Sequence, residues 1–257
     1  TMKRLKTVAW GGYGPELDEL AVWTRLFNEN ASNGYAVMRL TRDDKLVVYD
    51  GLTQERPEGE FQSFSCVFRP TLMACMRAGV SAISADSTFL PLRPDLNMLV
   101  CEGECPSAMS NGLTIVPVAN HLCFGESGES YIDMWKFMVD YSDGIAAQWL
   151  HGITLHADRG PGGCMASALA HVLPSAIFRS CAFHVWQALE RNVPPKDRID
   201  RKLFMTLVDT VTQEGFRRLL THIRNKSDAS FQYIIDSGPE EYCKGHPDFV
   251  TTFNTGV

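Results

Sequence analysis

The order of strand-like and helix-like segments between residues 80 and 193 is the feature that most limits how this chain can fold. Three strand-like runs come first: VSAISAD at 80–86, LNMLVCEG at 96–103 and GLTIVPVANHL at 112–122. A helical stretch follows at 129–142, and two further strands, at 152–158 and 176–181, each lead into a helical run. This order predicts a mixed α/β sheet with flanking helices.

Two further segments lie on either side of this core. Residues 1–63 combine a helical run with two strands, and we expect an N-terminal helix-and-strand module there. Residues 64–79 predict a mostly buried helix, so the central core is expected to span 64–193. Strand-like runs stop after this point, and 194–257 predict an all-helical segment whose helices lie between 199 and 243.

Composition narrows the class of protein. A chain of 257 residues has room for one large domain, or for a domain with a sizeable insertion. No apolar run approaches the roughly 18 residues that a membrane span needs, and no leader peptide is recognisable. Eight scattered cysteines predict reduced thiols in the cytosol or nucleus. The net charge of −6 argues against a domain that binds DNA by itself, because phosphate binding needs basic surface.

Two aspartates follow predicted strands in similar ways. Asp86 ends the strand at 80–86, and Asp158 ends the strand at 152–158, just before a turn rich in glycine and proline. If the strands are neighbours, the two carboxylates converge at one sheet edge, where a divalent cation would relieve their repulsion. Oxygen ligands favour Mg²⁺ or Mn²⁺ over zinc. The alternative is that each aspartate caps a turn or the following helix.

A cysteine and a histidine open the helix after the fifth strand. Cys181 and His184 are three residues apart and therefore share a helix face. A zinc site would need two more ligands, for which His156, Cys164 and His171 are the available donors. The pattern favours instead a buried core thiol at Cys181, with His184 hydrogen-bonded beneath the sheet edge. His156 shares a strand face with Asp158 and could support it.

Several ordered motifs resemble those of the Mutator-like (MULE) transposases. Asp86-Ser87-Thr88-Phe89 is similar to the family's Asp-x-Thr-Phe, and Asp158-Arg159-Gly160-Pro161-Gly162 to its Asp-Arg-x-Pro-Gly. A strand, an acidic turn and a tryptophan-containing helix lie between them, and Cys181-x-x-His184 follows. The resemblance covers roughly residues 60–193.

The resemblance implies an RNase H-like fold that holds a DDE triad and is interrupted by an all-helical insertion. Asp86 and Asp158 would be the first two acids and would hold Mg²⁺ or Mn²⁺, with Thr88, His156 and Arg159 nearby. Cys181 and His184 would form the family's motif near the site. The activity would be metal-dependent DNA strand cleavage and strand transfer. The partners would be transposon ends and target DNA, the assembly a homo-oligomer, and the location the nucleus, with the cytoplasm as alternative.

No glutamate of this chain matches the position of the third acid in the family's pattern. The resemblance places a glutamate beyond Val257, after a segment like TTFNTGV. Glu240 and Glu241 fall in a predicted turn, and Glu214 in the helical segment, so none of them is favoured. Basic residues in that segment could contact the DNA backbone or form ordinary solvated helix faces: Lys196, Arg198, Arg201, Lys202, Arg217, Arg218, Arg224 and Lys226.

Two other functions remain open from the sequence. A domesticated, catalytically inactive RNase H-like module could serve as a scaffold that binds DNA or protein, and the missing third acid and the acidic charge favour it. An unrelated metal-dependent nuclease or phosphatase on a similar sheet would be favoured only if Cys181 and His184 lie away from the site.

Overall fold

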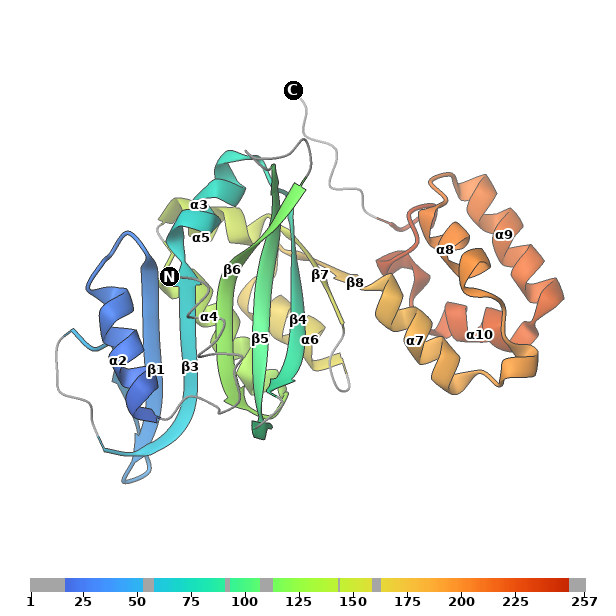
Figure 1. The fold of residues 1–257 in the computed structure, drawn as a ribbon. Coiled ribbons are helices and arrows are strands. Elements are labelled where there is room, and N and C mark those ends of the chain that lie inside the picture. The colour runs from blue at the N-terminus through green and yellow to red at the C-terminus, as the bar shows by residue number, and fades with distance from the viewer. Residues whose placement is uncertain are drawn as a thin grey trace. The chain divides into compact units, whose positions relative to one another are not determined.

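The computed structural model describes residues 17–52, 58–90, 93–106, 113–142, 144–158 and 163–249. The chain divides into two compact units, which are described one at a time (Figure 1). The first comprises residues 1–155 and 159–177, and the second comprises residues 156–158 and 178–257. The first unit contains most of the sheet, and the second consists mainly of helices.

The sheet has eight strands in the order β2-β1-β3-β6-β5-β4-β7-β8. Their bounds are β1 Gly34–Arg42, β2 Lys45–Tyr49, β3 Glu60–Phe68, β4 Ala82–Leu90, β5 Arg93–Pro106, β6 Leu113–Phe124, β7 Thr154–Ala157 and β8 Ile177–Ser180. All pairs from β2 to β4 are antiparallel. β7 and β8 are parallel. The Ile177 N–H donates to the Ile153 carbonyl and the Cys181 N–H to the Ala157 carbonyl, so the residue numbers of donor and acceptor increase in the same direction. The predicted mixed α/β sheet is confirmed.

Helices cover both faces of the sheet in the first unit (Figure 1). On one face α2 (Leu17–Asn28) places Leu20, Trp23 and Phe27 against β1 and β3, where Trp23 meets Phe64 edge-on at 5.2 Å between ring centroids. On the other face α4 (Gly128–Asp140) packs on β3 and β6 and contacts α6 (Cys164–Val172). α4 begins after Ser127, whose side chain accepts a hydrogen bond from the Ser130 N–H.

The segment predicted as one helix at 64–79 is a strand followed by a helix. β3 continues to Phe68, and the helix α3 (Arg69–Arg77) begins only at Arg69, with Pro70 in its first turn. The prediction of a helix from residue 64 was therefore wrong. Ser65 pairs with Val37 of β1 on one side and His121 of β6 on the other, and these ladder bonds outweigh the local helical spacing.

Gly34, at the start of β1, allows a close approach that no other residue permits. Its φ is +131°, and a Cβ there would lie 1.8 Å from the Val67 carbonyl oxygen. We expect Gly34→Ala to lower the free energy of unfolding by about 2 kcal/mol, because the strand pair must separate. Gly144→Ala is the matched control, since a Cβ there meets nothing within 4 Å and Ala favours the helix α5 (Gly144–His151).

Urea unfolding of both variants measures this difference. The glycine requirement would be contradicted if Gly34→Ala and Gly144→Ala had equal stability.

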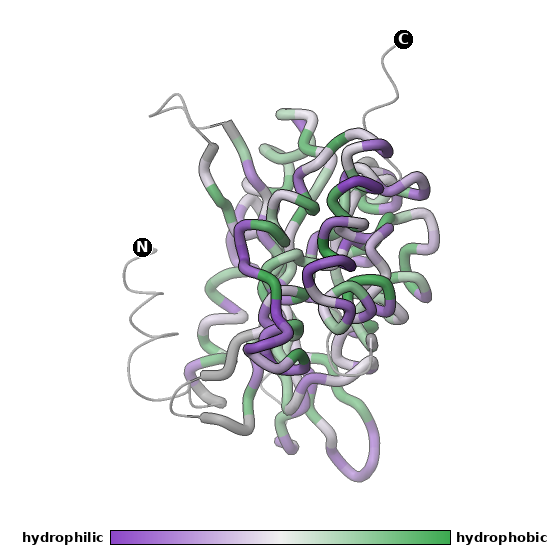
Figure 2. Tube along the Cα trace, turned by 90° about the vertical axis from the view of Figure 1, so that its right-hand side faces the viewer, coloured by the Kyte–Doolittle hydropathy of each residue, from purple (hydrophilic) through white to green (hydrophobic). Residues whose placement is uncertain are grey.

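The second unit is built from four helices around its own core. They are α7 (Ala182–Asn192), α8 (Arg201–Asp209), α9 (Gln213–Lys226) and α10 (Asp228–Asp236). Each of the last three begins at a side-chain cap: Asp200, Thr212 and Ser227 accept bonds from backbone N–H groups three residues on. Hydropathy alternates along these helices (Figure 2), and the apolar faces enclose Phe204, Ile223 and other core residues. The helices predicted between 199 and 243 are confirmed.

Candidate active site

Asp86 lies in the middle of β4 rather than at its end. The strand continues to Leu90, because its pairing with β5 extends past Asp86, which lies opposite Val100. The prediction that Asp86 ends a strand was therefore wrong. Its exposure follows from strand alternation, since Ile83 and Ala85 are buried and Asp86 faces outward. The Ser87 N–H donates to Asp86 Oδ1 at 2.9 Å, which leaves Oδ2 for other partners.

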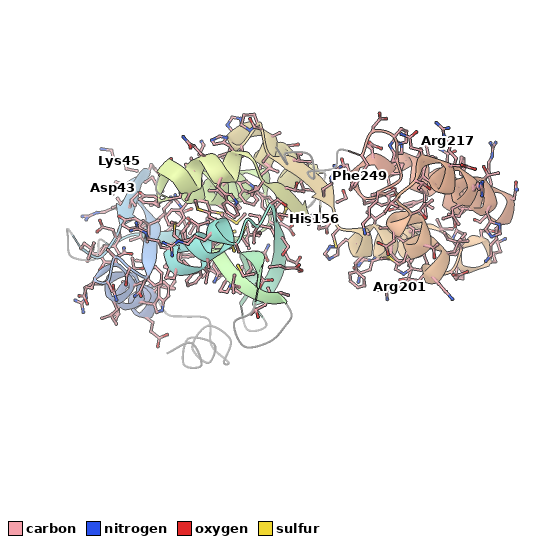
Figure 3. All side chains as sticks on the ribbon, turned by 90° about the horizontal axis from the view of Figure 1, so that it is seen from above. Asp43, Lys45, His156, Arg201, Arg217 and Phe249 are labelled. Carbon is pink, nitrogen blue, oxygen red and sulfur yellow. The ribbon has the colours of Figure 1, made fainter. Side chains whose placement is uncertain are left out.

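Asp158 directly follows β7 and is exposed. Along β7 the side chains alternate: Leu155 and Ala157 are buried, whereas His156 and Asp158 are exposed. His156 and Asp158 thus lie on one strand face, as predicted, and Figure 3 labels His156. Asp158 does not cap the next helix, because the N-cap of α6 is Gly163.

The strands that carry the two acids are neighbours in the sheet. The Thr154 N–H, at the start of β7, donates to the Ser81 carbonyl just before β4 at 2.8 Å. Because the two strands meet start to start, they run in the same direction. Asp86 belongs to the first unit and Asp158 to the second. Convergence of the two carboxylates on one metal ion therefore stays a prediction.

The side chains of two residues expected near the acids, Thr88 and Arg159, lie outside the described part of the structure. Thr88 lies in β4, two residues after Asp86, but its side chain is outside the described part of the structure. Arg159 also lies outside the described residues.

Cys181 and His184 lie at the junction between β8 and α7. Cys181 is the N-cap of α7, and its N–H donates to the Ala157 carbonyl at 2.8 Å, which ties the helix start to the end of β7. Cys181 is half-buried rather than buried, because the chain leaves the sheet at this residue. His184 Nδ1 is enclosed but finds no hydrogen-bond partner among the described residues, contrary to the prediction. Its ring instead meets Phe183 at 5.8 Å between centroids.

No group of three or more His, Cys, Asp or Glu side chains in the described residues is placed to hold a metal ion. The zinc donors considered from the sequence therefore form no such group: His156, Cys164, His171, Cys181 and His184.

Within the second unit, the end of β8 makes contacts that the sequence did not predict. Ser180 donates a hydrogen bond to a carboxylate oxygen of Glu241, and Arg179 donates to the Glu240 carbonyl at 2.8 Å. The Arg179 guanidinium also lies 3.9 Å from the centroid of Phe249, which Figure 3 labels. Burial lowers the pKa of Arg179, and nearby Glu241 opposes this shift. Glu241 thus has a structural partner, and no local pattern could have revealed a contact across 61 residues.

Half of the eight basic residues singled out from the sequence form ion pairs. These pairs are Arg198–Glu190, Arg218–Glu214, Arg224–Asp228 and Lys226–Asp200. The Leu203 N–H and Lys226 lower the pKa of Asp200. Arg201 and Arg217 lie at separate places on the helical unit (Figure 3). Acidic partners thus offset four of these eight basic charges.

Comparison of the chain with protein-family models and with curated proteins gave no match. None of the helices in the described residues has the length and apolar character needed to span a bilayer.

Proposed function

We propose that this chain is the RNase H-like catalytic core of a Mutator-like DDE transposase. In this proposal Asp86 and Asp158 hold Mg²⁺ or Mn²⁺ for cleavage and strand transfer of DNA, and the insertion is the helical segment 194–257. The proposal includes DNA as partner, a homo-oligomeric assembly and a nuclear location. Its third acid is not assigned to a residue of this chain.

The strand order is the observation that carries the proposal. Counted from β4, the five strands β6-β5-β4-β7-β8 stand in the order third, second, first, fourth and fifth. The first three are antiparallel, and the last two run parallel to the first. This is the order expected of an RNase H-like sheet, whose catalytic acids lie on the first and fourth strands. Asp86 and Asp158 occupy or directly follow those two strands.

The donor set at these positions fits a hard divalent ion. Both side chains are exposed carboxylates, and Mg²⁺ commonly uses one or two protein carboxylates and completes its shell with water and substrate phosphate. When bound, the ion would supply activation of the attacking water or hydroxyl and neutralise charge at the leaving oxygen. The Ser87 N–H donates to one oxygen of Asp86, and His156 lies on the same strand face as Asp158. The chain's own contribution is thus to position carboxylates, which is most of what phosphoryl transfer requires.

Metal binding tests the assignment of the two acids. We expect the chain to bind Mn²⁺ in calorimetry, and we expect Asp86→Asn and Asp158→Asn each to weaken binding by at least about tenfold, because each removes a charged ligand. Nicking of supercoiled plasmid in the presence of Mn²⁺ is the second readout, and both substitutions should abolish it.

Asp43→Asn is the matched control, since Asp43 is exposed in the β1–β2 turn with φ 50°, a conformation that Asn tolerates. If Mn²⁺ affinity is the same in all three variants, these acids do not form the metal site. Circular dichroism of each variant excludes loss of the fold as the cause of weaker binding.

A catalytically inactive scaffold that binds DNA or protein is the second candidate, and the ion pairs favour it. Four of the eight basic side chains that could contact the DNA backbone form ion pairs with acidic residues instead. Retained binding of a partner by a chain that binds no Mn²⁺ would support this candidate over the enzyme.

A further inference from the structure

Two buried cysteines from different elements of the first unit lie in direct contact. Cys75 of α3 and Cys105 of β5 have their Sγ atoms 3.2 Å apart, although they are 30 residues apart in the chain. Both side chains are free thiols. Other cysteines make contacts of a different kind: Cys101 Sγ lies 4.0 Å from the sulfur of Met134, and Cys123 Sγ lies near backbone carbonyls.

The local backbone is shaped to hold this pair. Cys101, Gly103 and Cys105 alternate onto the buried face of β5, against which α3 packs. A Cβ at Gly103 would lie 2.5 Å from Cys75 Sγ, so only glycine leaves room for that sulfur. The absence of a side chain at Gly103 therefore leaves space for the Cys75 sulfur beside Cys105. Neither thiol belongs to the proposed metal site.

We propose that Cys75 and Cys105 are a redox-modification site, at which a small hydroperoxide such as hydrogen peroxide converts the two thiols into a disulfide. A low-molecular-weight dithiol reverses the reaction by thiol–disulfide exchange. The disulfide would pin α3 to β5. The proposal does not depend on the function proposed above.

Exposure sets the order of the two chemical steps. Cys105 is 7% exposed and Cys75 is fully buried, so Cys105 reacts with the peroxide first. The Cys105 thiol gives up its proton as its sulfur attacks one peroxide oxygen, so that an S–O bond forms and the O–O bond breaks. The departing hydroxide takes up that proton and becomes water. The Cys75 sulfur then attacks Cys105 Sγ, so that the S–S bond forms and the S–O bond breaks. The second hydroxide leaves with the remaining thiol proton as water. Each sulfur gives up one electron, and the peroxide takes both.

The contact also explains why Cys75 acts second. Its S–H can donate to the Cys105 sulfur, from which it is separated by 3.2 Å. Burial, together with the neighbouring Cys105, raises the pKa of Cys75 to about 12, so this thiol keeps its proton until Cys105 has been oxidised.

Thiol counting on the whole chain tests the proposal. The reduced protein is treated with hydrogen peroxide, unfolded, blocked with N-ethylmaleimide and analysed by mass spectrometry. We expect free thiols to fall from eight to six, with one disulfide that joins Cys75 to Cys105 in a chymotryptic digest. Dithiothreitol should restore all eight. The oxidised protein should also melt at a higher temperature, because the disulfide closes a loop in the unfolded chain.

Three alanine variants separate the roles. Cys75→Ala and Cys105→Ala should both lose the disulfide, whereas Cys101→Ala, a buried thiol on the same face of β5, should keep it. Dimedone should trap a sulfenic acid at Cys105 in Cys75→Ala, but none at Cys75 in Cys105→Ala. The proposal is overturned if the native chain keeps eight thiols, if peroxide joins other cysteines, or if Cys105 is oxidised without joining Cys75. The disulfide map of the unmutated chain decides these outcomes even if a variant does not fold.

Discussion

Trp135→Ala is expected to lower the free energy of unfolding by about 3–5 kcal/mol, the largest single loss that we predict for this chain. Trp135 is fully buried at the centre of α4, the helix that packs against the sheet and α6. Its Nε1 has no hydrogen-bond partner among the described residues, so the loss comes from packing. Truncation would remove a large apolar ring and leave a cavity that a rigid sheet cannot fill.

Urea unfolding followed by circular dichroism measures this loss. Leu26→Ala is the control, because Leu26 is 55% exposed on α2, and its truncation should change stability by no more than about 0.5 kcal/mol. Equal stability of the two variants would show that the α4 packing contributes far less than its burial implies.

Stability is expected to fall as pH drops from about 6.5 to about 3, because of one buried histidine. His121 of β6 is fully enclosed, and burial, followed by the nearby Arg39 charge, lowers its pKa to about 3. In the unfolded chain the His121 side chain takes up a proton near pH 6.5, whereas in the folded chain it does so only near pH 3. Acid therefore favours the unfolded state. The stability contribution is therefore complete above pH 6.5 and is lost on acidification. The loss between pH 8 and pH 5 should be about 2 kcal/mol.

The surroundings of His121 explain why it stays neutral. Its Nδ1 lies 2.8 Å from Ser65 Oγ, which accepts a hydrogen bond from the Arg39 guanidinium at 3.1 Å. The Arg39 guanidinium lies 5.9 Å from the ring centroid of Phe137 in α4, and His121 Nε2 has no partner in the described part of the chain. A proton on His121 would thus add a second positive charge beside Arg39 in a buried place.

Urea unfolding at pH 8, 6 and 5 tests this expectation. His121→Gln should flatten the dependence of stability on pH over this range, even if the substitution lowers stability at every pH. His171→Gln, at an exposed position on α6, should leave the dependence unchanged. If the slope of stability against pH is the same in His121→Gln as in the native chain, His121 is not its source.

Local patterns in the sequence were sufficient to predict many of the elements and the shared strand face of His156 and Asp158. A period of two sets the faces of β4 and β7, so Asp86 and Asp158 face outward beside buried Ala85 and Ala157. Helices were predicted wherever apolar residues recur at helical spacing, as in α4. The helix α5 was not predicted, since its eight residues are too few for a clear period and it is held by a distant contact, from Trp149 Nε1 to the Val80 carbonyl.

The candidate site and the thiol pair depended on pairings that no local pattern contains. The sequence by itself determined that strands bearing Asp86 and Asp158 exist, because side-chain alternation and turn residues act within a few positions. Only the tertiary structure decided that β4 and β7 are neighbours, that residues 64–68 complete a strand between β1 and β6, and that Cys75 meets Cys105. Ladder hydrogen bonds and side-chain contacts of this kind join residues tens of positions apart. Their energies depend on the whole fold, and they override the preferences of each short segment.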